Sequence, residues 1–231
     1  MMRIACAATA ALLLLAPAAG AAQSGLQIEL TPRVGYYAPQ DGVGAAAPAG
    51  GIWYVELERI EPTASLEASA RISWAGSPLS ARVHGLVALP SDVSGRFTCY
   101  PGLACPEVLM LTRAEATIWA AVADMVFSPF ESSPMRPFLA LGAGVKRYSF
   151  SWPDAAVLVE AGTYSENGVA LHAGVGLEVA LAGAPLRLEL SDYWSPEGRG
   201  LRGPDPDQVA EPRRNAQHDL AVSLGWSVLR F

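Results

Sequence analysis

The sequence predicts an all-β fold, a closed, antiparallel, up-and-down transmembrane β-barrel of eight strands. Three observations carry this prediction. Apolar and polar residues alternate with a period of two along most of the chain, which is the pattern of β-strands. Short turns alternate with long polar loops between these segments, as they do in transmembrane barrels. The chain is 51% hydrophobic, yet after its first residues no apolar run is long enough for a transmembrane helix.

The alternation places the apolar residues of each strand on one face. In the first strand Leu26, Ile28 and Leu30 share a face, and Gln27 and Glu29 lie on the other. The later segments repeat this arrangement, with Gly, Ala, Ser and charged residues on the second face. The predicted strands are residues 26–37, 64–75, 79–90, 107–127, 136–150, 168–181, 185–194 and 216–231.

The connections differ in length and character. The sequences AGSP, SPFESSPM and AGAP make three short turns, and the links 38–63, 91–106, 151–167 and 195–215 are long and polar. Residues 52–60 leave two possibilities, an extra β-hairpin arm in the first long loop or the second strand itself. We favour the arm, because the tight AGSP turn then falls on the side of the short turns.

Residues 1–22 have the composition of a cleaved secretory signal peptide. Arg3 precedes an apolar run at 5–18, and the small residues AAGAA follow it. An N-terminal anchor helix is the alternative, but the run is short and rich in alanine. We therefore expect an exported chain with one barrel domain over residues 23–231.

Charge and cysteine content restrict the partners. The net charge of −6 argues against nucleic acid as a partner. In an exported protein the neighbouring Cys99 and Cys105 most simply form a disulfide that closes a small loop. A metal site there would need further ligands, and none lies near in the sequence. We expect no metal and no cofactor.

The polar face decides between a transmembrane barrel and a soluble, lipocalin-like periplasmic barrel. In a soluble barrel the charges would face outward, and many lysines would be expected, whereas Lys146 is the only lysine here. We assign both signs of charge on this face to the barrel interior, and we interpret the two histidines there as satisfied members of a polar network, with ligand or titrating roles as alternatives. The predicted interior residues are Glu29, Arg33, Glu67, Arg71, Arg82, His84, Arg113, Glu115, His172, Glu178, Arg187 and Glu189.

The chain ends on an aromatic residue in the last predicted strand, GWSVLRF. With the stretches RPFLALGAGVKRY and LRLELSDYW, this ending resembles the small bacterial outer-membrane β-barrel proteins of the OmpA/OmpX type. Leu229 and Phe231 match the C-terminal assembly signature of that family. The resemblance implies the outer membrane of a Gram-negative cell, insertion by the barrel-assembly machinery, and termini on the periplasmic side.

One departure from the family pattern concerns the last strand. Leu220, Val222, Leu224 and Trp226 keep one parity, but Phe231 has the other. Either a bulge near Leu229 shifts the register, or Phe231 turns outward below the edge of the membrane. Because the family signature prefers an outward Phe, we expect an irregularity there.

These features favour a structural or surface-interaction role. An eight-stranded barrel is just wide enough to be filled by side chains, so the interior charges are expected to form a plug of salt bridges. Two alternatives remain open: a narrow, porin-like channel, and a lipid-modifying acyl hydrolase or transferase that uses His218 with Asp219, Ser191 or Asp192. We expect contact with outer-membrane lipid and lipopolysaccharide; the sequence identifies no loop partner.

Overall fold

The computed structural model describes residues 25–40, 45–48, 53–99, 111–130, 133–152, 162–181, 184–195 and 217–230. Every regular element in these ranges is a β-strand. They are β1 (Leu26–Pro39), β2 (Ala45–Pro48), β3 (Trp53–Ile60), β4 (Thr63–Trp74), β5 (Leu79–Cys99), β6 (Leu111–Phe127), β7 (Met135–Trp152), β8 (Gly162–Leu181), β9 (Ala184–Ser195), β10 (Gln217–Trp226) and β11 (Leu229–Arg230).

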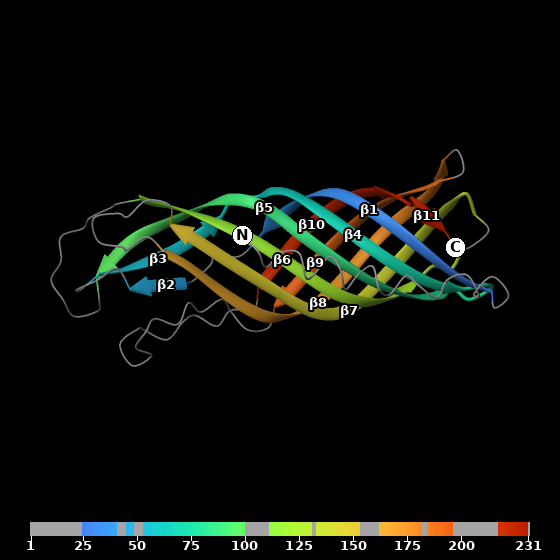
Figure 1. Cartoon of the computed structure of the whole chain (residues 1–231), viewed down its shortest axis with the longest axis horizontal. Helices are drawn as coiled ribbons and strands as arrows, with labels where there is room; N and C mark the ends of the chain where they lie inside the picture. The colour runs from blue at the N-terminus through green and yellow to red at the C-terminus, as the bar shows by residue number, and fades with distance from the viewer. Residues whose placement is uncertain are drawn as a thin grey trace, which may run out of the picture.

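Eight of these strands close into a barrel (Figure 1). From β4 to β10 each strand is antiparallel to the next, β4 pairs with β1, and β10 returns to pair with β1. The pairing of β1 with β10 includes Val34 with Leu224 and Tyr37 with Ala221. Closure leaves the barrel strands without a free edge, which is the condition for placing a sheet in hydrocarbon. The predicted fold class is confirmed.

The first long connection contains the predicted hairpin arm. β2 and β3 pair with each other, and β3 pairs with the far end of β5, from Trp53 opposite Cys99 to Ile60 opposite Val93. The second barrel strand is β4, which starts at Thr63 after Glu61 and Pro62. Since proline has no backbone N–H to donate to a ladder, Pro62 is suited to this break between strands.

The exterior of the barrel is apolar and its interior polar. β10 shows this most clearly, because Leu220, Val222 and Leu224 are exposed while Asp219 and Ser223 are buried. This is the reverse of a soluble barrel, whose apolar residues face inward. Within the described ranges no helix is long and apolar enough to cross a membrane.

Aromatic side chains lie on the outer surface near strand ends. Tyr36, Trp74 and Trp226 are exposed there, as the girdles of a transmembrane barrel require. Tyr148 is different, because it is buried in the interior. The even-numbered residues of β7 face inward at this end of the strand, as the burial of Lys146 and Phe150 shows.

The expected irregularity near the C-terminus is present. β1 pairs Arg33 with Gly225 in β10, but Leu30 with Leu229 in β11, which inserts one extra residue between the two ladders. Residues 227 and 228 lie outside the strands, and both Val228 and Leu229 are exposed. The bulge therefore changes the parity of the residues that follow it, as predicted.

At the end of the barrel with the short turns, backbone hydrogen bonds connect neighbouring strands. Gly76 in the AGSP turn has φ +75, a left-handed conformation that glycine adopts without strain. The amide of Ser77 donates to the carbonyl of Trp74 at 3.0 Å, and the amide of Ala75 donates to the carbonyl of Gly25 at 2.8 Å. Strands β1, β4 and β5 are thereby tied together at one rim, which lies at the right of Figure 1.

Candidate functional site: the polar interior of the barrel

Among the described residues, the interior contains three clusters of charged and polar side chains along the barrel axis. The mouth cluster, at the end with the short turns, consists of Glu29, Arg71, Arg136, Glu178 and Arg187. The central cluster consists of Arg33, Glu67, Arg82, His84, Asp124, His172 and Glu189. The distal cluster, towards the long loops, consists of Tyr37, Lys146, Tyr148 and Asp219.

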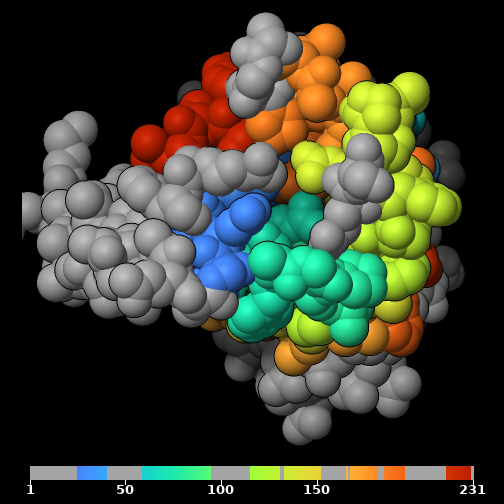
Figure 2. Space-filling model, turned by 90° about the vertical axis from the view of Figure 1, so that its right-hand side faces the viewer, coloured from blue at the N-terminus to red at the C-terminus, as the bar shows by residue number. Residues whose placement is uncertain are grey.

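Glu178 organises the mouth cluster. Its Oε1 accepts from Arg71 Nη1 and from Arg187 Nη2, both at 2.5 Å, and its Oε2 lies 3.0 Å from Arg136 Nη2. A second carboxylate, that of Glu29, is 3.4 Å from Arg187 Nη2. The end of the barrel that faces the viewer in Figure 2 contains a cavity of about 280 Å³, lined in part by Arg71, Arg136 and Glu178.

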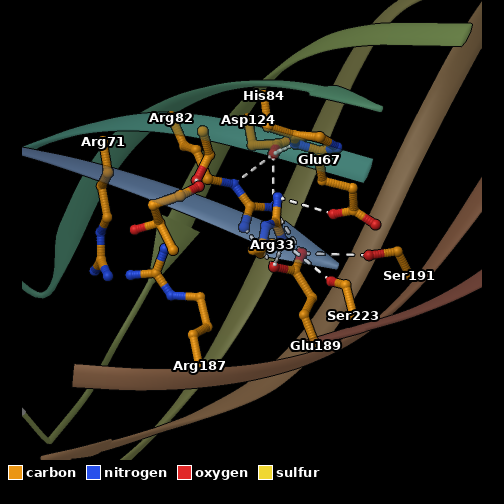
Figure 3. Close-up of polar contacts among 12 residues, drawn as sticks. Arg33, Glu67, Arg71, Arg82, His84, Asp124, Arg187, Glu189, Ser191 and Ser223 are labelled. Atoms are coloured by element: carbon orange, nitrogen blue, oxygen red, sulfur yellow. Dashed lines mark hydrogen bonds and ion pairs between the residues drawn. The ribbon is translucent and has the colours of Figure 1, made fainter. Parts of the chain in front are cut away.

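Glu189 organises the central cluster (Figure 3). Its Oε2 accepts from Arg33 Nη1 at 2.5 Å and from Arg82 Nη1 at 2.6 Å, and its Oε1 accepts from Arg82 Nη2 at 2.7 Å. Arg82 also donates from Nε to Asp124 Oδ2 at 2.9 Å, while Glu67 lies 3.3 Å from Arg33. Bidentate contacts of this kind are among the strongest ionic hydrogen bonds in proteins.

Two histidines share the carboxylate of Asp124. His84 Nδ1 is 3.0 Å from Asp124 Oδ2, and His172 Nδ1 is 2.9 Å from Asp124 Oδ1. The remaining nitrogen of His84, Nε2, is 2.7 Å from the hydroxyl of Tyr193. These side chains come from β5, β6, β8 and β9, so the group connects four strands through the lumen.

Asp219 organises the distal cluster. Its Oδ2 accepts from Lys146 Nζ at 2.7 Å, from the hydroxyl of Tyr37 at 2.5 Å, and from the hydroxyl of Tyr148. Lys146 also donates to the backbone carbonyl of Tyr193 at 3.2 Å. The chain's single lysine is therefore an interior residue.

The charges of the three clusters nearly cancel. The mouth cluster has three arginines and two carboxylates, the central cluster two arginines and three carboxylates, and the distal cluster one lysine and one carboxylate. In a space of low polarity an unpaired charge is very costly, so this balance is what allows so many charged side chains to be buried in the interior. The paired side chains of the central cluster connect strands on different sides of the lumen.

Most of the predicted interior residues lie in these clusters, but two do not. Glu115 is exposed on the outer face, and the side chain of Arg113 lies outside the described residues. The inward residues of β6 are the even-numbered ones, including Ile118 and Ala120. Since both faces of β6 are apolar over most of its length, the sequence does not show which parity faces inward.

Several interior residues were not predicted from the sequence. The missed residues of β6 and β7 lie at even-numbered positions, which face inward in these strands, and assigning the even positions to the interior would have identified them. The missed residues of β1, β9 and β10 lie at positions that the alternation of apolar and polar residues already assigns to the interior, so the sequence was sufficient to identify them. The interior residues that were not assigned are Arg136, Lys146, Asp124, Tyr37, Tyr148, Tyr193 and Asp219.

The residues of the alternative catalytic site are separated by the wall of the barrel. His218 and Asp192 are on the outer face, with His218 Nδ1 2.8 Å from Asp192 Oδ2. Asp219 and Ser191 point inward, where Asp219 binds Lys146 and Ser191 donates to Glu189 at 3.3 Å. The structure thus provides His218 with a carboxylate partner, but neither Asp219 nor Ser191 can reach it.

Several predicted features lie outside the described residues. They are the signal peptide at 1–22, the side chain of Cys99 and all of Cys105, Phe231, and most of the long loops. The disulfide, the cleavage and the domain limits therefore stay predictions.

Comparison with known proteins shows the fold. The sequence matches no protein-family model and no curated protein. A major outer membrane protein from Thermus thermophilus superposes with a TM-score of 0.58 at 14% identity, over 89% of this chain and 99% of that one. OprG from Pseudomonas aeruginosa gives 0.49 at 11% identity (90% and 96%), and Neisserial surface protein A gives 0.48 at 10% identity (89% and 97%).

These solved structures are outer-membrane proteins or surface proteins of bacteria by their own descriptions. The likeness to the Thermus protein is a likeness of fold, and it agrees with the closed strand order. The chain has the fold of the small eight-stranded outer-membrane β-barrels.

Proposed function

We propose that the protein is an integral component of the bacterial outer membrane with a structural or surface-interaction role. The observation that supports this most directly is the combination of an apolar exterior with an interior filled by mutually paired charges. An apolar exterior suits lipid, and a filled lumen leaves no wide path for solutes. The barrel then serves as a rigid anchor for the hairpin arm and the long loops at its end.

The packing of the central cluster argues against a channel. The side chains of Arg33, Arg82 and Glu189 are at most 1% exposed, and they are joined across the lumen by contacts of 2.5 to 2.7 Å. An ion passing this level would have to separate buried charges from their partners, which is costly in a space of low polarity.

The displayed surface is the end of the barrel with the long loops. There β3 extends the sheet along β5 beyond β4, and β2 adds a further strand, so that a β-hairpin arm projects at the left of Figure 1. At the same end Arg147 lies on the outer face and donates to Ser165 at 2.7 Å. We propose that this rim contacts lipopolysaccharide phosphates and that the arm and loops contact external partners.

Three measurements test the proposal: fractionation of an expression strain, conductance of the protein in planar bilayers, and analysis of the lipids of the same strain. The protein is expected in the outer-membrane fraction, with a gel mobility that changes on heating, because a closed barrel resists unfolding by detergent. Recovery as a soluble periplasmic protein without detergent would contradict the proposal. Stable single-channel steps in planar bilayers would support the channel alternative. A change in phospholipid or lipid A acylation that depends on His218 would support the enzyme alternative. The observation in favour of that alternative is the contact between His218 and the carboxylate of Asp192.

A second prediction concerns assembly. Phe231→Ala is expected to lower severalfold the amount of barrel inserted in the membrane, because the resemblance assigns Leu229 and Phe231 to the assembly signature. The inserted fraction should retain nearly the stability of the parent, because the signature is expected to act during assembly and not in the closed barrel. Quantitative blotting of heat-modifiable barrel measures the yield. Leu220→Ala, an outward position in β10, is the control, and equal yields for both variants would contradict the signature.

A further inference from the structure

The cavity at the end of the barrel with the short turns is lined by side chains that can donate hydrogen bonds. Arg71 and Arg136 line it, and so do the neutral side chains of Gln27, Ser73 and Ser128. The Arg71 side chain is 11% exposed and that of Arg136 is 22% exposed, so neither is sealed off from solvent. A volume of about 280 Å³ holds several water molecules, or one small ion with some of its water.

Positive charges outnumber negative charges around this cavity. The mouth cluster has three arginines and two carboxylates, those of Glu29 and Glu178, and therefore carries one net positive charge. All three arginines contact the same carboxylate, that of Glu178. Because Arg71 and Arg187 donate to one and the same oxygen, their guanidinium groups are immediate neighbours, and like charges at this distance repel each other.

Arg187 adds a buried donor to this excess of positive charge. Its Nε and Nη2 donate to Glu178 Oε1 at 3.1 and 2.5 Å, but its Nη1 has no hydrogen-bond partner among the described residues. The side chain is only 2% exposed, and a buried donor without a partner is costly. Figure 3 shows Arg187 and Arg71 together at one end of the polar interior. An anion at the cavity would compensate the charge that these neighbours concentrate there.

The two arginines that line the cavity retain N–H groups for a ligand. A guanidinium has five N–H donors. The described hydrogen bonds of Arg71 use one hydrogen each on Nε, Nη1 and Nη2, with Ser80, Glu178 and Ser128 as acceptors. The described contact of Arg136 is a single ion pair, from Nη2 to Glu178 at 3.0 Å. The contacts within the cluster therefore do not exhaust the donors of either side chain.

We propose that the mouth cavity binds one phosphate-type oxyanion, held by Arg71 and Arg136. Paired N–H groups of arginine match the oxygens of a phosphate, and this match gives the contact both strength and direction. The short turns of a transmembrane barrel face the periplasm, so the ligand is a soluble periplasmic phosphate or the phosphate of a lipid headgroup. The central cluster, deeper in the lumen, has two arginines and three carboxylates, so an anion is held at the mouth and does not pass inward.

The test measures binding of inorganic phosphate to the folded protein. The untagged full chain is folded in octyl glucoside, a detergent without phosphate, and heat-modifiable gel mobility confirms closure of the barrel. Equilibrium dialysis against radiolabelled phosphate at low ionic strength counts the bound anions. We expect one equivalent, displaced by sulfate and weakened by added salt, because charges in a solvent-accessible cavity are screened.

Two substitutions should move the affinity in opposite directions. Arg136→Gln is expected to weaken phosphate binding at least about tenfold, the loss of one charge-assisted contact. Glu29→Gln removes a negative charge from the lining and is expected to tighten binding severalfold. Arg59→Gln is the matched control, because Arg59 is an exposed residue of β3 in the hairpin arm, and it should bind phosphate like the parent.

If Arg136→Gln does not fold, the tighter binding of Glu29→Gln decides the matter, since a purely structural role of the cluster gives no gain in affinity. The absence of stoichiometric binding, equal affinity of folded Arg136→Gln and the parent, or an equal loss in Arg59→Gln would overturn the proposal. Phosphatidylglycerol added to the micelles separates the two sources of the ligand. Its competition with inorganic phosphate would support a lipid headgroup as the natural ligand, and binding of phosphate without that competition would support a soluble one.

Discussion

Arg82→Gln is expected to lower the free energy of unfolding by about 3–5 kcal/mol, the cost of breaking a buried ion pair by removing one partner. Arg82 donates to Asp124 and twice to Glu189, at 2.6 to 2.9 Å. Without it, the three carboxylates of the central cluster face Arg33 as their one remaining arginine in that cluster. Glutamine retains much of the side-chain length but supplies no charge.

The measurement is urea-dependent folding into lipid vesicles, followed by heat-modifiable gel mobility and tryptophan fluorescence. Arg59→Gln is the matched control, because the side chain of Arg59 is 64% exposed and lies 3.9 Å from Glu61. An exposed pair of this kind contributes about 0–1 kcal/mol, so the control should fold like the parent. Equal effects of the two substitutions would show that the interior charges are hydrated and that the lumen is not a dry plug.

Gly144→Ala in β7 is expected to have the second largest effect. A Cβ atom at this position would lie 2.6 Å from Val122 Cα and 2.7 Å from Val122 Cγ1, and closer still to the carbonyl oxygen of Ala121. Two of these three atoms belong to the backbone of β6, so they cannot move aside as a flexible side chain would. Overpacking of this kind costs about 1–3 kcal/mol and sometimes more. We expect a loss of that size and slower barrel closure.

Gly168→Ala is the control for this substitution. Gly168 lies on the neighbouring strand β8, opposite Lys146, and a Cβ atom there has nothing within 4 Å. The same chemical change should therefore leave folding yield and urea midpoint nearly unaltered. If Gly144→Ala folds with the yield and midpoint of Gly168→Ala, the close approach of β6 and β7 does not exist in the membrane.

The strand pattern explains why most of the fold could be predicted. In β10 and in the second half of β8, aliphatic residues occupy one parity and polar or small residues the other, so both the strand and its inward face can be identified from the sequence. The bulge before β11 could also be predicted, because the parity of Phe231 conflicts with that of Leu220 to Trp226. The physical basis is that lipid and lumen select opposite residue types at alternate positions.

The pattern was insufficient where both faces of a strand carry similar residues. In β6, Trp119 and Met125 face outward while Ile118 and Val122 face inward, and hydrophobicity alone does not distinguish the two sets. This is why Glu115 was assigned to the interior and Asp124 was not. Alternation is a local property, whereas the inward direction of a strand depends on its register with its two neighbours.

The sequence by itself determined the fold class, the strand order and most of the charged interior. Only the tertiary structure decided which charges meet, because partners such as Arg82 and Glu189 are 107 residues apart and come together through barrel closure. Closure likewise placed His84 and His172 on one carboxylate, and it separated His218 from Asp219 by the barrel wall. Alternation specifies whether a side chain faces the lumen or the exterior. The stagger of all eight strands specifies its position along the barrel axis, and therefore which other side chains it can contact.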